Sequence, residues 1–193
     1  ITGIDLVGLQ IDLAQTGRLP LKQADIKQRG HAMQCRLYAE NPRERFMPST
    51  GTIQALAWPQ HPHARLEHDL HKGMVITPFF DPMIAKILSY GHTRGEAQAA
   101  MQSLLARLFI TGINTNKQLL AGILQSPFFT HGAFHTQTLA DHDVVLLLTH
   151  EQAASTDDEL YAGLACVLAS MHETAPTGQE SSIGRLWKGQ SWR

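Results

Sequence analysis

The sequence predicts an α/β domain of the α+β type: a small, mostly antiparallel sheet with helices packed on one side, followed by a helical tail. Segments that alternate apolar and polar residues with the period of strands occupy the first half of the chain, and a capped amphipathic helix follows them. Runs of strands followed by helices favour this arrangement over alternating βαβ units. No apolar run approaches the roughly 20 residues needed to cross a bilayer.

The amino-terminal stretch predicts an amphipathic helix over residues 3–15. Apolar side chains recur there at helical spacing, and Gly17 supplies a stop of the left-handed type. Residues 18–29 contain Pro20 and scattered charges, so we interpret them as a connector.

Residues 31–40 have the clearest strand pattern. One face carries Met33, Cys35, Leu37 and Ala39, and the other carries Gln34, Arg36, Tyr38 and Glu40. Such alternation places one face on an apolar core and the other in solvent. The pattern therefore predicts that Arg36 points away from the core, whereas Cys35 is an inert small hydrophobe rather than a nucleophile.

The predicted sheet is completed by residues 51–58, 64–70 and the second half of 83–90, whose first half is ambiguous between helix and strand. Thr93 and Glu96 then form a capping box, which predicts a helix beginning at this point. Another helix is predicted near residues 115–125, with Pro127 as its stop.

The composition of the chain changes beyond about residue 142. Residues 157–172 carry apolar side chains at helical spacing with acidic residues in the first turn, and 174–183 are typical of a linker. We predict a domain over 1–142, a helical connector over 143–175, and a linker with the truncated start of a following domain over 176–193. Because the first residue is Ile1 rather than methionine, we also expect a fragment of a longer protein.

The charge balance excludes several classes of partner. The formal net charge is −1, so no basic field favours nucleic acid or an anionic membrane.

No segment resembles a signal peptide. Cys35 and Cys166 lack the spacing of a disulfide framework, which indicates reduced thiols and a cytoplasmic protein.

Eight blocks occur in an order found in one known family. They are Ile-Thr-Gly-Ile-Asp-Leu-Val at 1–7, Arg-Gly-His-Ala at 29–32, Cys-Arg-Leu-Tyr-Ala-Glu-Asn-Pro at 35–42, Phe-Met-Pro-Ser-Thr-Gly at 46–51, Phe-Phe-Asp-Pro-Met-Ile-Ala-Lys at 79–86, Tyr-Gly at 90–91, Thr-Arg-Gly-Glu-Ala at 93–97 and Gly-Ile-Asn-Thr-Asn at 112–116. Together they resemble the carboxyl-terminal subdomain of biotin carboxylase, the ATP-grasp enzyme of biotin-dependent carboxylases.

The resemblance implies a two-stage reaction with biotin, ATP and Mg²⁺. In the family, ATP and bicarbonate give carboxyphosphate, and the carboxyl group then passes to N1 of biotin. The Mg²⁺-binding glutamates, the phosphate-gripping lysine and the glycine-rich loop belong to an ATP-grasp domain that precedes this region in the same chain. None of them is present here, so we expect this chain alone to be inactive and to act as a ligase only within the full-length subunit.

Arg36 matches the family arginine that contacts biotin and helps to hold its ureido oxygen and the nearby carboxylate or phosphate. Guanidinium is planar, always cationic, and offers paired donors to oxyanions. Such donors lower the cost of negative charge that develops when N1 loses its proton. The alternative is a surface arginine paired with Glu40 or another carboxylate.

The remaining candidate residues are less specific. Arg65 aligns with a position that the family uses at its homodimer interface, although a solvated strand arginine explains it nearly as well. Thr136 and Gln137 lie in a stretch that, in the family, contacts the edge of the adenine pocket. Asp81 is expected to cap a turn rather than to act chemically. The histidines at 61, 63, 68 and 71 lack the convergent spacing of a zinc site, so we expect no metal.

The block at 79–86 and the tail resemble the α subunits of acyl-CoA carboxylases, with a weak preference for methylcrotonyl-CoA carboxylase. This implies a biotin carboxyl carrier domain and a carboxyltransferase β subunit as partners, in the cytoplasm or, in a eukaryote, in the mitochondrial matrix. No Ala-Met-Lys-Met biotinylation motif is present. The rival interpretation is a stand-alone binding or scaffold domain without catalysis.

Overall fold

The computed structural model describes residues 1–143 and 147–148. The chain divides into two compact units, whose described parts are Ile1–Gly30 and the residues from His31 onward. The boundaries predicted at 142/143 and 175/176 stay predictions, and the predicted helix at 157–172 lies outside the described residues. Among the described residues, no helix combines the length and apolarity that a bilayer crossing requires.

The first unit contains helix α1 (Leu6–Thr16). Asp5 caps it, because its Oδ1 accepts a hydrogen bond of 2.9 Å from the Gly8 amide. Gly17 ends it at a φ of 67°, and its amide donates to the Leu13 carbonyl. The predicted helix and its glycine stop are confirmed. The connector that follows contains only the short helix η1 (Gln23–Asp25).

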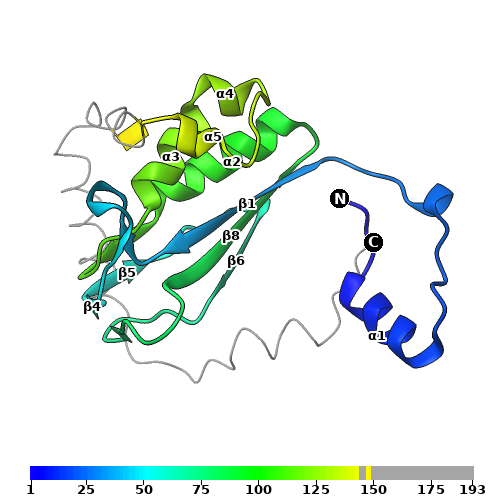
Figure 1. Cartoon of the computed structure of the whole chain (residues 1–193), viewed down its shortest axis with the longest axis horizontal. Helices are drawn as coiled ribbons and strands as arrows, with labels where there is room; N and C mark the ends of the chain where they lie inside the picture. The colour runs from blue at the N-terminus through cyan, green and yellow to red at the C-terminus, as the bar shows by residue number, and fades with distance from the viewer. Residues whose placement is uncertain (144–146, 149–193) are drawn as a thin grey trace. The chain divides into compact units, whose positions relative to one another are not determined.

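The centre of the second unit is a three-stranded antiparallel sheet in the order β1-β8-β6 (Figure 1). Its strands are β1 (His31–Tyr38), β8 (Met83–Gly91) and β6 (Ala64–His68). Strand β8 begins at Met83, so it includes the half that the sequence pattern left ambiguous. The pairing of β1 with β8 shifts register between Leu37 and Tyr38, which marks a β-bulge.

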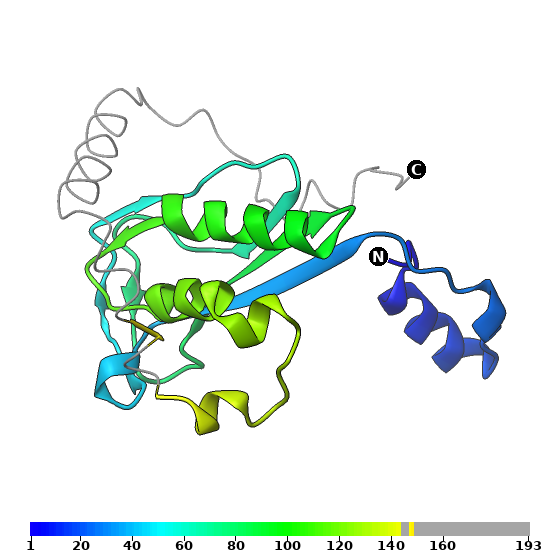
Figure 2. The same ribbon diagram turned by 90° about the horizontal axis from the view of Figure 1, so that it is seen from above.

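Helices α2 (Arg94–Arg107) and α3 (Lys117–Gln125) cover one face of this sheet, as Figures 1 and 2 show. The buried core joins the inward side chains of the strands to those of the two helices: Cys35, Leu37, Ala85, Ile87, Met101, Leu104, Leu105, Leu108, Ala121 and Leu124. The predicted fold class, a small antiparallel sheet with helices on one side, is therefore confirmed.

The start of α2 differs slightly from the predicted capping box. Thr93 Oγ1 accepts from the Glu96 amide at 3.2 Å, as expected, and Glu96 Oε2 accepts from the amide of His92, one residue earlier, at 2.9 Å. Pro127 does more than end α3, because it opens the short helix α4 (Pro127–Thr130) that Ser126 caps. A last short helix, α5 (Thr138–Asp141), follows.

The prediction that residues 51–58 form one strand of the main sheet is wrong. The segment divides into β4 (Gly51–Thr52), which pairs with β7 (Val75–Ile76), and β5 (Ala55–Ala57), which pairs with β9 (Phe109–Thr111). The chain changes partner at the buried Ile53, whose amide donates to the Met74 carbonyl, while the next amide, of Gln54, donates to the Thr111 carbonyl.

Two further features complete the periphery of this unit. Strand β2 (Glu40–Asn41) pairs with β3 (Met47–Pro48) around the short helix η2 (Pro42–Glu44). Gly112 has a φ of 98°, and a Cβ at this position would collide with the Thr52 carbonyl oxygen. Only glycine therefore allows the chain to leave β9 alongside β4.

Candidate functional site

The face of the sheet opposite α2 and α3, here called the open face, carries two rows of side chains. Register places Arg36, Lys86 and Glu67 across the three strands in one row, and Gln34, Leu88 and Arg65 in the next. Directly opposed residues of an antiparallel pair project on the same face. Arg36, Lys86 and Arg65 are exposed, and Glu67 is half-buried.

The charges on the open face are not balanced. Arg65 Nε lies 2.6 Å from Glu67 Oε1, so the single carboxylate of the two rows is already paired. Among the described residues, no carboxylate lies within ion-pairing distance of Arg36 or Lys86. Two cations directly opposite each other across a strand pair repel. The open face therefore presents Arg36 without a carboxylate partner among the described residues, next to a second cation, and this arrangement suits an oxyanion.

The other face of β1 confirms how the strand aims Arg36. Cys35 and Leu37, its two neighbours, are both buried in the core. Burial in an apolar environment raises the pKa of the Cys35 thiol to about 12, so the thiol stays protonated. The predicted outward direction of Arg36 and the predicted inward direction of Cys35 are both confirmed.

Pairing of Arg36 with Glu40, the alternative left open by the sequence, does not occur in the structure. Glu40 is half-buried in β2, and desolvation raises the pKa of its carboxyl group. Asp81 acts as predicted in a turn, because its Oδ1 accepts from the Met83 amide at 2.7 Å at the start of β8.

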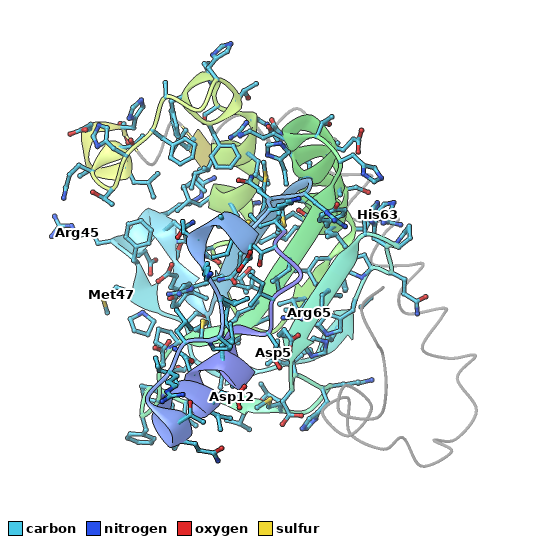
Figure 3. All side chains as sticks on the ribbon, turned by 90° about the vertical axis from the view of Figure 1, so that its right-hand side faces the viewer. Asp5, Asp12, Arg45, Met47, His63 and Arg65 are labelled. Carbon is cyan, nitrogen blue, oxygen red and sulfur yellow. The ribbon has the colours of Figure 1, made fainter. Side chains whose placement is uncertain are left out.

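The other predicted site residues lie apart from Arg36. Arg65 projects from β6, shortly after His63 in the chain (Figure 3). Thr136 and Gln137 are exposed just before α5. The backbone amide of Gln137 donates to His135 Nδ1, and its carbonyl accepts from the Ala140 and Asp141 amides at the start of α5. Among the described residues, no hydrogen bond or ion pair links Thr136 or Gln137 to β1.

The histidines do not form a metal centre in the described part of the chain. His61, His63 and His92 line an open hollow of about 410 Å³ together with Tyr90 and Glu96. No group of three or more histidine, cysteine or carboxylate side chains in the described ranges is placed to hold a metal ion. His61 Nδ1 accepts from the His63 amide at 3.2 Å, so the fold uses this imidazole locally.

Comparison with known proteins agrees with the block order. A family model described as the biotin carboxylase C-terminal domain matches residues 34–141. The chain belongs to this family. Biotin carboxylase 1 of Bacillus subtilis is 39% identical over 145 residues, which are 75% of this chain and 32% of that protein.

Two further relatives extend the comparison. The mitochondrial methylcrotonoyl-CoA carboxylase subunit alpha of Mus musculus is 32% identical over 91% of this chain and 24% of its own length. The biotin carboxylase domain dimer of Hydrogenobacter thermophilus 2-oxoglutarate carboxylase, solved with MgADP, ADP and bicarbonate, is 38% identical with a TM-score of 0.68 over 74% of this chain and 31% of that chain. The chain thus spans about a third of the length of the biotin carboxylases it matches.

Sequence reasoning missed two residues of the biotin carboxylase fold that bear on Arg36. Lys86 faces Arg36 across β8, and extending the strand alternation through Ala85 and Ile87 reveals its outward direction. Asn116 bonds to the backbone of β1 from a position 80 residues away in sequence. Its presence in the block at 112–116 was the only signal in the sequence.

Proposed function

We propose that this chain is the carboxyl-terminal part of an ATP-dependent biotin carboxylase, in which Arg36 contacts biotin and its carboxylating partner. The observation that supports this most is the exposed Arg36 on the open face, opposite Lys86 and without a carboxylate partner among the described residues. Guanidinium matches the planar geometry of carboxylate and phosphate, so an exposed arginine without a carboxylate partner is free to bind a substrate oxyanion.

Arg36 would act by holding negative charge. Its guanidinium can donate two parallel hydrogen bonds to the ureido oxygen of biotin or to a carboxylate or phosphate beside it. As N1 of biotin loses its proton, charge develops on the ureido oxygen, and a fixed cation at that oxygen lowers the barrier. Lys86, across the strand, adds a second positive charge to the same surface.

ATP and Mg²⁺ need residues that the described part of this chain does not bring together. In the described ranges, no three or more His, Cys, Asp or Glu side chains converge on a position for a metal ion. We assign the metal and the phosphates to an ATP-grasp region of the full-length subunit, and only Thr136 and Gln137 to the edge of the nucleotide site.

The proposed partners follow from the same assignment. They are the ATP-grasp region, a biotin carboxyl carrier domain, a carboxyltransferase β subunit, and a second copy of the subunit that meets Arg65. The subunit alpha relatives from Mus musculus and Arabidopsis thaliana match 91% and 97% of this chain, which supports an acyl-CoA carboxylase of methylcrotonyl type. The proposed compartment is the cytoplasm, or the mitochondrial matrix in a eukaryote.

The coding sequence before Ile1 tests this proposal against the alternative of a stand-alone binding domain. About 300 codons, the length of two domains, should encode the ATP-grasp blocks. A reading frame that starts near Ile1 would contradict the enzyme assignment. The segment 1–193, purified alone, is expected to show no bicarbonate-dependent ATP hydrolysis, and measurable turnover would contradict that expectation.

Arg36→Ala in the full-length subunit tests the role of the side chain. We expect ATP-dependent carboxylation of free biotin to fall about 10²-fold, the loss typical of one oxyanion donor, with an unchanged melting temperature because Arg36 is exposed. Arg43→Ala is the matched control, since Arg43 is also exposed and lies outside the open face. Carboxylation at the parental rate by the Arg36→Ala subunit would refute the assignment.

A further inference from the structure

Among the described residues, Asn116 bonds to the outer edge of β1, and no strand pairs with that edge. In the sheet order β1-β8-β6, β8 pairs with only one side of β1. On the other side, Asn116 Nδ2 donates to the Arg36 carbonyl at 3.2 Å, and the Tyr38 amide donates to Asn116 Oδ1 at 2.9 Å. The backbone amide of Asn116 also donates to the Tyr38 carbonyl at 3.2 Å. Asn116 thus fixes the backbone on both sides of Leu37.

The side chain of Asn116 is not used where its position would normally direct it. Asn116 is the N-cap residue of α3, where asparagine is favoured because its side chain accepts from a first-turn amide. Here it makes no capping bond to α3. The side chain is 6% exposed and is directed to β1 instead. The side-chain amide of Asn116 therefore binds the backbone of β1 and does not cap α3.

The three bonds lie where the pairing with β8 is irregular. Arg36 pairs with Lys86 and Leu37 with Ala85, but Tyr38 then pairs with Met83, so the register shifts just after Leu37. A bulge of this kind bends a strand and re-aims its side chains. In addition, the like charge of Lys86 repels the Arg36 guanidinium. Regular pairing with β8 therefore ends at Leu37, the residue next to Arg36.

We propose that Asn116 is a positioning residue for Arg36: its side-chain amide fixes the backbone of residues 36–38 and thereby the direction of the guanidinium on the open face. This inference rests on the proposed function of Arg36. It assigns no contact between Asn116 and any substrate, since the side chain is buried on the edge of β1.

A double-mutant cycle in the full-length subunit tests the proposal. Asn116→Ala removes both side-chain bonds, and Asn116→Asp keeps the acceptor for the Tyr38 amide but places an oxygen against the Arg36 carbonyl. In the parental background, each replacement should lower kcat/KM for free biotin about tenfold, because a small displacement of an oriented group is costly. The KM for ATP should not change. In an Arg36→Ala background, each should cost less than about twofold.

Two matched controls separate positioning from a general loss of structure. Asn114→Ala replaces an exposed asparagine of the same loop. Among the described residues, Asn114 bonds through its backbone amide, to Ser49 Oγ, and its side chain makes no hydrogen bond. It should leave activity and melting temperature unchanged. Gln98→Ala removes another buried amide, which donates to the Leu124 carbonyl at 2.6 Å at the far end of α3. It should lower the melting temperature without changing kcat/KM for biotin.

The outcomes distinguish this inference from the proposed function. If the parental subunit carboxylates biotin and the Asn116 replacements cost the same factor with and without Arg36, the positioning role is wrong while the proposed function stands. The positioning role is equally wrong if neither replacement folds, since Asn116 is then a folding residue. If the parental subunit does not carboxylate biotin, the proposed function fails and the role of Asn116 fails with it.

Discussion

The two faces of β1 carry opposite chemistry on alternate residues. On one face, Cys35 and Leu37 are buried against the helices, and burial keeps the thiol protonated. On the other face, Arg36 is exposed with Lys86 directly across the strand pair. A slip of one residue would exchange the two faces. The strand therefore holds an exposed cation and an inert core at adjacent positions, and register is what separates them.

Thiol reactivity should show the largest difference between the faces. Gln34→Cys introduces a thiol on the open face, next to the native Cys35. Because the pKa of Cys35 is about 12 against the ordinary value of 9.0, its thiolate fraction at about pH 8 is about 10³-fold lower. We expect alkylation of Cys35 to be slower by at least that factor, measured by tandem mass spectrometry of the peptide that carries positions 34 and 35, which is separate from the peptide of Cys166.

The control for this experiment is the unfolded chain, in which both thiols should react at the same rate. The raised pKa of Cys35 also predicts how the stability of the folded chain depends on pH. Since the pKa of Cys35 is raised in the folded state, its contribution to stability is complete below about pH 9 and is lost as the pH rises toward 12. Alkylation of Cys35 in the folded protein within tenfold of the introduced thiol would mean that the buried face opens.

Stability should show the second difference. Leu37 is fully buried, and Leu37→Ala should lower the free energy of unfolding by about 3 kcal/mol through lost burial and a residual cavity. Lys86→Ala on the open face should change it by less than about 0.5 kcal/mol, because an exposed side chain opposite a like charge adds little. Urea unfolding monitored by circular dichroism measures both. Equal losses would contradict the assignment of the faces.

The pattern of β1 was predictable because local alternation and burial agree from Met33 to Leu37. Residues 51–58 were also predicted as one strand, yet they do not form one strand of the main sheet, because the partner changes at Ile53. Alternation reports which side of a segment is buried, but it does not report which strand lies beside it. That information resides in contacts with Met74 and Thr111, far along the chain.

The candidate site also contains one residue that local sequence pattern predicts and one that depends on distant contacts. Arg36 was found because its type, its place in the alternation and its block all agree. Asn116 was not found, because its role depends on three hydrogen bonds to β1 and local spacing points to a helix cap instead. Side-chain bonds across 80 residues leave no periodic trace in a single sequence.

The smallest effect is expected within the open face itself. Arg65 and Glu67 are paired at 2.6 Å, but their side chains are 50% and 37% exposed. Water screens such a pair, so a double-mutant cycle of Arg65→Ala and Glu67→Ala should give a coupling below about 0.5 kcal/mol that decreases with added salt.

A weakly coupled Arg65 can exchange Glu67 for a carboxylate of a second subunit at little cost, as the proposed dimer interface requires. Arg65→Ala should therefore weaken dimerisation of the full-length subunit, followed by analytical ultracentrifugation, and leave the unfolding free energy of this chain nearly unchanged. A coupling above about 2 kcal/mol would instead bind Arg65 to its own strand and argue against that interface.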